Sequence, residues 1–392
     1  LVFQLKNRRT MKKILFGLLI LGFFSCGEED SNEIFQGKLE DFVVDKFILK
    51  KDSTTKRINL QKQITYNEKH FFLSKDEKGY SLFSASNGEK NHSFTIPDEG
   101  PISLNGYHIA SQGFDNSEFV AISSTGNVKM YIDGDQRAEI NLDWSAYDEL
   151  PMIQMSDKKD NFRKIGEGHF QLVNNPTNPF AENYVDVNFG KWIAEFDLRD
   201  GWICTSNFSS GLGEEFSNSS SAASLISVHN PNNDEFYVMF SPSDSLFQIK
   251  NCEVVRKLKL TSRSRFDYLP GIYEKNGRNR SWRSNPKSAA NTDLAYDPIN
   301  ELYLRMVKVK TEESRPEVTD IRLRQGLNKS TYLMLVYNSK WELKAELEII
   351  YDIGQTIGNL IATPRGVFIP KPEQKSEDEY ELYIIDLSKF SN

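Results

Sequence analysis

The sequence contains little of what marks an enzyme site. Its five histidines show no His-Glu-x-x-His or other metal-ligand spacing. It also lacks a Gly-x-Ser-x-Gly turn for a serine nucleophile, a Gly-rich phosphate loop and a Cys-x-x-Cys pair. Acidic residues are so numerous that, without geometry, no two of them can be assigned to glycoside hydrolysis. The sequence therefore predicts no catalytic residue, no metal site and no cofactor.

Long apolar runs are also scarce. The run Ile14–Phe24 holds 11 consecutive apolar residues, which is too short to span a bilayer because a spanning helix takes about 20. Lys12 and Lys13 precede it, so this stretch has the charge and the length of a signal-peptide core. We expect Met11 to be the start of the protein and residues 1–25 to be a leader and signal peptide. No second run reaches transmembrane length.

The end of this run resembles a bacterial lipoprotein processing site. Ser25-Cys26 follows Phe23 and Phe24, and these bulky residues resemble the permissive form of the site in Bacteroidetes lipoproteins. The resemblance implies that the sulfur of Cys26 is lipidated and that Cys26 becomes the new N-terminus. Several acyl chains would then attach the protein stably to a membrane. The alternative is an ordinary secretory signal with a cysteine at this position by chance.

Residues 26–36 are short, polar and acidic, and we expect a flexible tether because they offer too little apolar surface to offset their ordering entropy. Glu28, Glu29 and Asp30 resemble the signal that sends Bacteroidetes lipoproteins to the outer face of the outer membrane. The resemblance implies a lipid-anchored outer-membrane protein exposed at the cell surface. The whole chain has a net charge of −7, and the leader takes away only basic residues. This acidity argues against a nucleic-acid partner.

Residues 37–392 have the pattern of one strand after another, with short turns between them. Asn87-Gly88 lies between two such segments, which is a strong hairpin signal because both residues accept positive φ. Residues 341–349 include good helix formers, but their strict alternation favours a strand. The alternating residues are Trp341, Leu343, Ala345, Leu347 and Ile349 against Glu342, Lys344, Glu346 and Glu348. We expect an all-β fold.

A weak repeat divides this region into blades. Asn230-Pro231 and Asp297-Pro298 each lead into an aromatic-rich strand, and Asn175-Pro176 is a looser third copy. Strand pairs recur roughly every 59 residues, against roughly 40–50 for a four-stranded propeller blade. Their expected starts lie near Phe71, Phe119, Val185, Tyr237, Tyr303 and Val367. Six starts predict a single six-bladed β-propeller domain over residues 37–392, which leaves few exposed sheet edges. Seven blades, or two β-sandwiches, are the alternatives.

The segment Asp297–Arg305 and the closing Tyr380–Asp386, together with the lipoprotein-like start, resemble a family of Bacteroidetes lipoproteins of unknown function. The resemblance covers essentially the whole chain after the leader and implies a TolB-like six-bladed propeller in the cell envelope. It implies no catalytic residue, because its motifs are structural.

Two cysteines remain after Cys26, namely Cys204 and Cys252. Both lie inside expected strands. An exported protein is exposed to an oxidising compartment, so a disulfide is permitted. Two buried free thiols are the simpler interpretation, and the one we favour from the pattern alone.

Residues 256–287 are unusually basic for this acidic chain. Arginine makes paired hydrogen bonds to carboxylate, sulfate or phosphate groups, and tyrosine and tryptophan offer flat faces to sugars. The candidate ligand-binding residues of this basic segment are Arg263, Arg265, Tyr268, Tyr273, Arg278, Arg280, Trp282 and Arg283. The alternative is a solvated loop whose charges balance acidic residues of neighbouring blades.

These observations predict a lipid-anchored envelope propeller that acts as a binding or assembly module for an anionic ligand, a glycan or a partner envelope protein. The alternative function is a polysaccharide-acting enzyme, a glycoside hydrolase or lyase. That alternative rests on fold analogy alone.

Overall fold

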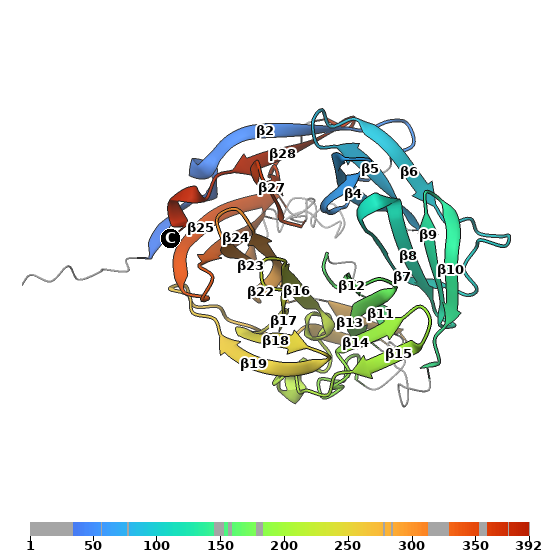
Figure 1. Cartoon of the computed structure of the whole chain (residues 1–392). Helices are drawn as coiled ribbons and strands as arrows, with labels where there is room; N and C mark the ends of the chain where they lie inside the picture. Colours follow the sequence, from blue (N-terminus) through green and yellow to red (C-terminus); the bar gives the residue numbers. More distant parts are fainter. Residues whose placement is uncertain are drawn as a thin grey trace, which may run out of the picture. The chain divides into compact units, whose positions relative to one another are not determined.

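The structure is a computed structural model that describes residues 34–55, 57–76, 78–144, 153–155, 159–177, 183–276, 279–283, 285–312, 329–352, 359–374 and 376–391. Cys26 lies outside these residues. Within the compact unit Phe35–Asn392, six small sheets follow one another around a central axis as the blades of a β-propeller (Figure 1). The predicted all-β, six-bladed fold is confirmed, and the alternatives of seven blades and of two sandwiches are wrong.

Blades 1 to 4 are built from consecutive strands that run from the axis outward. In blade 3 the innermost position is shared by two short strands, β11 and β12, which both pair with β13. The strands of blades 1 and 2 are β3 (Leu60–Tyr66), β4 (Lys69–Asp76), β5 (Gly79–Ser84), β6 (Lys90–Thr95), β7 (His108–Gly113), β8 (Glu118–Ser123), β9 (Asn127–Ile132) and β10 (Asp135–Asn141). Those of blades 3 and 4 are β11 (Ile153–Met155), β12 (Phe162–Gly166), β13 (His169–Pro176), β14 (Ile193–Asp197), β15 (Gly201–Thr205), β16 (Leu225–Asn230), β17 (Glu235–Phe240), β18 (Ser245–Lys250) and β19 (Glu253–Lys259).

Blades 5 and 6 use strands from both ends of the chain. Blade 5 comprises β22 (Ala290–Asp297), β23 (Leu302–Glu312), β24 (Lys329–Tyr337) and β25 (Leu343–Asp352), with β1 (Phe35–Lys38) added outside in parallel. Blade 6 comprises β26 (Ile361–Thr363), β27 (Gly366–Pro370), β28 (Glu379–Ile385) and β2 (Val43–Lys50). The helical elements of the described residues are short 3₁₀ turns: Leu39–Phe42, Asp115–Ser117, Glu214–Phe216, Ser220–Ala223 and Ser388–Phe390.

The predicted strand starts match the second strand of every blade except blade 3. Val185 lies between β13 and β14 and belongs to no strand, so that expected start is wrong. Pro176 likewise ends β13, whereas Pro231 and Pro298 lie in turns between first and second strands. The third copy is therefore not equivalent to the other two. In blade 3 the proline of the repeat lies at the end of β13, before the connection to β14. In blades 4 and 5 the corresponding proline lies in the turn between the first and second strands.

The ring closes in blade 6, where β2 forms the outermost strand. Its register with β28 runs antiparallel from Val43 opposite Ile385 to Lys50 opposite Glu379. Leu49 of this strand is fully buried and packs with residues of blades 6 and 1. Gly88, in the predicted hairpin turn between β5 and β6, lies against the same strand. Its φ is +72°, and a Cβ there would stand 1.8 Å from the Ile48 carbonyl oxygen, so only glycine fits.

Both ends of the compact unit meet at this closure. The rings of Phe35, Phe42 and Phe390 lie within 5.4–5.8 Å of one another. The Lys389 ammonium group lies 3.6 Å from the Phe35 ring centroid, close enough for a cation–π interaction. First and last residues of the propeller are thus held in one aromatic cluster.

Connections of different length alternate between the two ends of the blades, because the strands of each blade are antiparallel. Turns between first and second strands, such as Pro231–Asp234 and Pro298–Glu301, define a short-turn face. The longest described connections, 96–107, 206–224 and 260–271, all emerge at the opposite end, which we call the loop-rich face. Loops on a rigid scaffold are where binding residues concentrate.

Cys204 and Cys252 form a disulfide with a Cα–Cα distance of 6.2 Å. Cys204 lies on β15, the outer strand of blade 3, and Cys252 in the turn between β18 and β19 of blade 4. The favoured interpretation of two free thiols is therefore wrong. Strand pattern alone could not show that the outer edges of adjacent blades bring these residues together.

We predict that Cys204→Ser combined with Cys252→Ser lowers the free energy of unfolding by about 4 kcal/mol. This is the chain-entropy value for a crosslink that closes a loop of this length, the two cysteines being 48 residues apart. Urea denaturation of oxidised wild type and of the double variant measures the difference. Reduced wild type should unfold with the variant. An equal midpoint for all three samples would show that the disulfide adds no stability.

Candidate functional site

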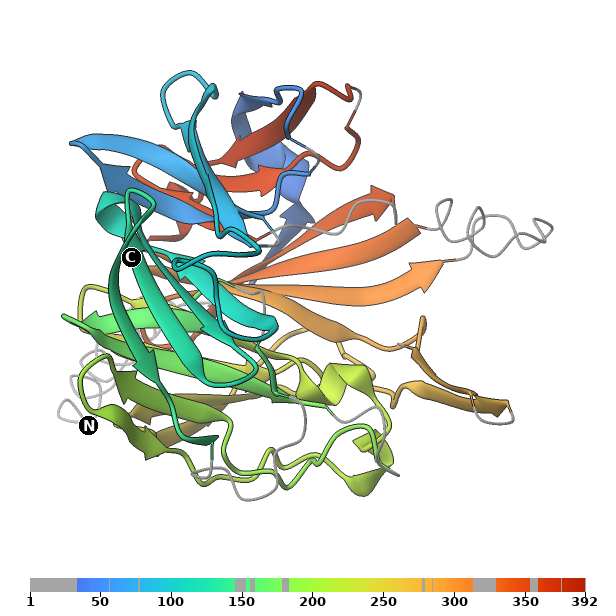
Figure 2. The same ribbon diagram turned by 90° about the vertical axis from the view of Figure 1, so that its right-hand side faces the viewer.

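The basic segment occupies the loop-rich side of blades 4 and 5. It begins on the outer strand β19, crosses between the blades over residues 260–271 and then forms a hairpin of β20 (Ile272–Asn276) and β21 (Asn279–Arg283). That hairpin is a separate two-stranded sheet and, among the described residues, pairs with no blade. In Figure 2 it projects, in gold, toward the same side as the long orange strands of blade 5.

Glu346 fastens the first part of this connection to blade 5. One of its carboxylate oxygens accepts hydrogen bonds from the backbone N–H groups of Arg263, at 2.6 Å, and Ser264, at 3.2 Å. The other oxygen accepts the Ser264 hydroxyl at 2.7 Å. Glu346 is only 3% exposed. Glu346 lies on the polar side of the alternating strand, and the basic segment covers it.

Arg305 holds the second part of the connection. Its Nη2 donates to Asp244 Oδ1 at 2.6 Å and to the Tyr268 hydroxyl at 2.8 Å, and its Nε donates to Asn291 Oδ1 at 2.7 Å. The Tyr268 hydroxyl in turn donates to Asp244 at 2.6 Å. Burial raises the pKa of Tyr268 well above its usual value, so this phenol keeps its proton. Arg305 is completely buried and joins blades 4 and 5.

These contacts distribute the candidate residues into anchors and exposed groups. Tyr268 is an anchor, because its hydroxyl is shared between Asp244 and Arg305. Arg263 is fastened through its backbone. Arg265 is 92% exposed, with Asp267 at 3.3 Å, so its guanidinium lies in solvent beside a single acid at the tip of the connection.

The hairpin register brings the remaining candidates together in two rows. Tyr273 stands opposite Trp282, and Lys275 opposite Arg280. Arg283 stands opposite Ile272, one position further along the strand. Arg278 lies outside the described residues.

A buried ion pair lies near the propeller axis at the loop-rich face. Lys159 Nζ lies 3.2 Å from Asp293 Oδ2, and the two side chains are 6% and 4% exposed. Asp293 also accepts the Leu360 backbone N–H at 2.6 Å, and Lys159 donates to the Leu360 carbonyl. Blades 3, 5 and 6 are thereby tied together at the axis.

Two further carboxylates near the axis, on the short-turn face, are also matched with bases. Glu118 accepts Lys164 Nζ at 2.6 Å. Asp234 lies 2.8 Å from His229 Nε2 and 3.5 Å from Arg163, and the hydrogen bond from His229 lowers the pKa of Asp234. Like Asp293, they act as links between blades. A glycosidase needs one carboxylic acid and one carboxylate on either side of a sugar, whereas each of these three carboxylates is paired with a base of another blade.

Sequence reasoning missed the residues that fix the basic segment. One signal for Arg305 was available: it stands in the apolar run Leu302–Val307, where an arginine must be buried and paired. Asp244 and Glu346 gave no such signal, because acids are common in turns and on the polar side of strands.

Comparison with solved structures supports the fold. A member of the DUF4221 family from Bacteroides vulgatus is 14% identical, with a TM-score of 0.64 over 88% of this chain and 97% of that one. A Bacteroides fragilis protein provisionally named as exported is 9% identical, with a TM-score of 0.48 over 90% of this chain and 98% of the other. At 14% identity the likeness to the DUF4221 protein shows the fold alone. No family model matches the sequence, and no curated protein matches it.

Within the described residues, no helix has the length and apolar character needed to cross a membrane.

We predict that Arg305→Met lowers the free energy of unfolding by about 3 kcal/mol, the lower end of the range for breaking a buried ion pair. The lower end applies because Asp244 is 28% exposed. Arg265→Met is the matched control, and as a surface change it should stay within about 0.5 kcal/mol. Urea denaturation compares the two. Equal shifts would show that Arg305 does not hold the two blades together.

Proposed function

We propose that the protein is a lipid-anchored component of the cell envelope that binds an anionic ligand through its basic segment. An acidic glycan is the ligand we would test first, and an acidic partner protein offers the same chemistry. The observation that carries the proposal is that one part of the basic segment is fixed by buried contacts and another part is exposed. Buried residues of blades 4 and 5 fix it in place, while Arg265 and the hairpin β20–β21 stand outside the blade sheets.

Fixed cations bind an anion better than mobile ones, because less conformational freedom is lost on binding. The Glu346 and Arg305 contacts supply that fixation at two points of the connection. Arginine suits the role because its planar guanidinium donates paired hydrogen bonds to carboxylate, sulfate or phosphate.

The proposed location rests on the signal-peptide pattern and on Cys26. A disulfide within the propeller is consistent with it, because disulfides persist in exported proteins. A polysaccharide-acting enzyme is the competing function. Measured turnover of any member of a polysaccharide panel by the purified propeller would replace binding with catalysis.

We predict that Arg265→Ser, Arg280→Ser and Arg283→Ser together weaken binding to heparin, a sulfated polysaccharide, by roughly a hundredfold. Each charge-assisted hydrogen bond contributes about 1.5–3 kcal/mol, so a hundredfold loss, about 2.7 kcal/mol, corresponds to losing one or two such bonds. Binding of the wild type should also weaken steeply with salt, since the screening length falls from about 10 Å at 0.1 M to about 3 Å at 1 M. Affinity is measured by titration over a salt series.

The control for this experiment is Lys46→Ser, Lys69→Ser and Arg137→Ser, which removes three exposed positive charges from other blades. It changes the net charge equally and should retain most of the heparin affinity. Thermal melting of both variants should match the wild type. If the two triple variants bind equally, net charge alone governs binding and the basic segment is not a site.

A separate prediction concerns the anchor. Cys26→Ala should release the protein from membrane fractions with its thermal melting unchanged, because the propeller begins at Phe35. Ser25→Ala keeps the sulfur and should leave the protein attached. Fractionation followed by a high-salt wash distinguishes lipid attachment from ionic adsorption. A Cys26→Ala protein that still sediments after the wash would disprove lipid anchoring.

A further inference from the structure

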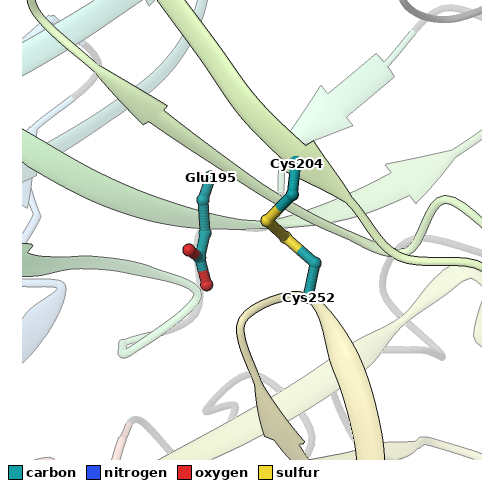
Figure 3. Close-up of side chains that lie close together, drawn as sticks. All are labelled: Glu195, Cys204 and Cys252. Carbon is teal, nitrogen blue, oxygen red and sulfur yellow. A yellow bond between two sulfur atoms is a disulfide. The ribbon is translucent and has the colours of Figure 1, made fainter.

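Three metal-binding side chains meet at the seam between blades 3 and 4, and His169 lies beside one of them. Glu195 and the two sulfur atoms of Cys204 and Cys252 place their ligand atoms within 4.8 Å of one another (Figure 3). His169 Nε2 lies 3.5 Å from the other side of this group, at Glu195 Oε2. The set is one imidazole, one carboxylate and two sulfurs.

The fold of blade 3 explains why three of them converge. Glu195 on β14 stands directly opposite Cys204 on β15, and opposite Gln171 on β13. His169 lies two positions before Gln171, so it shares the same side of the sheet. The neighbouring positions 170 and 196 are phenylalanines that pack toward blade 2. The polar side therefore faces blade 4, whose turn delivers Cys252.

The nitrogen and the carboxylate oxygen that face each other are only partly used. Glu195 is 4% exposed, and its Oε1 accepts a hydrogen bond from Gln171 Nε2 at 2.7 Å. His169 Nε2 is buried and has no hydrogen-bond partner. A buried nitrogen without a partner is costly, and an unoccupied ligand position is one reason for a protein to keep it.

We propose that His169, Glu195, Cys204 and Cys252 form a site for a thiophilic divalent metal ion, such as Zn²⁺, once the disulfide is reduced. In the oxidised protein each sulfur is part of the S–S bond and carries no thiolate charge with which to bind the ion. A dithiol reductant supplies two electrons and two protons, the S–S bond breaks, and the reductant leaves as its own disulfide. Metal binding then releases both thiol protons, and the two thiolates, the carboxylate and the imidazole bind the ion.

The ligand types favour zinc over calcium or magnesium. Thiolate and imidazole are preferred ligands of Zn²⁺, and four ligands complete its tetrahedral shell. The two thiolates and the carboxylate carry three negative charges, which a divalent cation offsets in part. Arg163 donates to Gln171 at 2.8 Å on the far side of Glu195, so a fixed positive charge lies behind the carboxylate.

The test uses the purified propeller, reduced with a water-soluble phosphine. The phosphine takes an oxygen atom from water to become the phosphine oxide and leaves two thiols. After its removal under argon, Co²⁺ is titrated in and the visible absorption of thiolate-bound cobalt is followed. Zn²⁺ competition then gives its affinity. We expect one ion per chain in the reduced protein and none in the oxidised protein.

Variants separate a built site from two thiols that bind metal by themselves. Glu195→Gln and His169→Ala should each weaken Co²⁺ binding roughly tenfold or more, a loss that even outer-shell partners of metal ligands can cause. Cys204→Ser with Cys252→Ser should abolish it. His70→Ala, which changes a histidine on β4 of blade 1, should bind as the wild type does.

Three results would overturn the proposal. The reduced wild type could bind no more Co²⁺ than the double serine variant. Glu195→Gln and His169→Ala could both bind as tightly as the wild type, which would assign binding to the thiols alone. Circular dichroism could show that the reduced protein unfolds before metal is added and stays unfolded with it. Folded, stoichiometric binding that needs all four residues supports the site.

Discussion

The pairing of β2 with β28 is the constraint on which the propeller depends. A ring of sheets leaves an open edge wherever it is interrupted, and an open edge exposes backbone groups and apolar side chains to water. Here β2 forms the outermost strand of blade 6, and its buried face packs against blade 1. The aromatic cluster of Phe35, Phe42 and Phe390 holds both ends at this junction. Each remaining blade then finds a neighbour on either side.

The seams between blades carry different chemistry on this common frame. Apolar clusters join blades 1 and 2, 2 and 3, and 5 and 6. Between blades 4 and 5 the contact includes the ring of Tyr237, which packs edge-on against Trp341 with 5.1 Å between centroids, and the fully buried Arg305. Between blades 3 and 4 a polar row leads from Asp234 through Arg163 to Glu195. An apolar cluster also joins blades 3 and 4. Buried polar groups cost more to assemble than apolar ones, so the polar groups of these two seams are where we place function.

Much of the fold could be predicted from local pattern, and the site much less. Alternation identified the strand over 341–349, and Asn87-Gly88 identified a hairpin, because both signals lie within a few residues. The expected strand start near Val185 was wrong because Val185 lies in the connection between β13 and β14. Glu346 and the cysteine pair could not be read from pattern, since their partners come from other blades. At such positions a residue is buried or exposed according to which distant segment packs over it. The residues next to it in the sequence do not indicate which segment that is.

The closure of the ring also has a consequence for the order in which the blades can fold. β2 is made among the first elements of the chain, yet its partner β28 comes from the opposite end. Until β28 has been synthesised and has reached β2, the backbone groups along the edge of β2 have no partner strand, and blade 6 is incomplete. Contacts between distant parts of a chain slow folding and lengthen exposure to aggregation. A chain of this topology therefore completes its last blade only after β28 has become available to pair with β2.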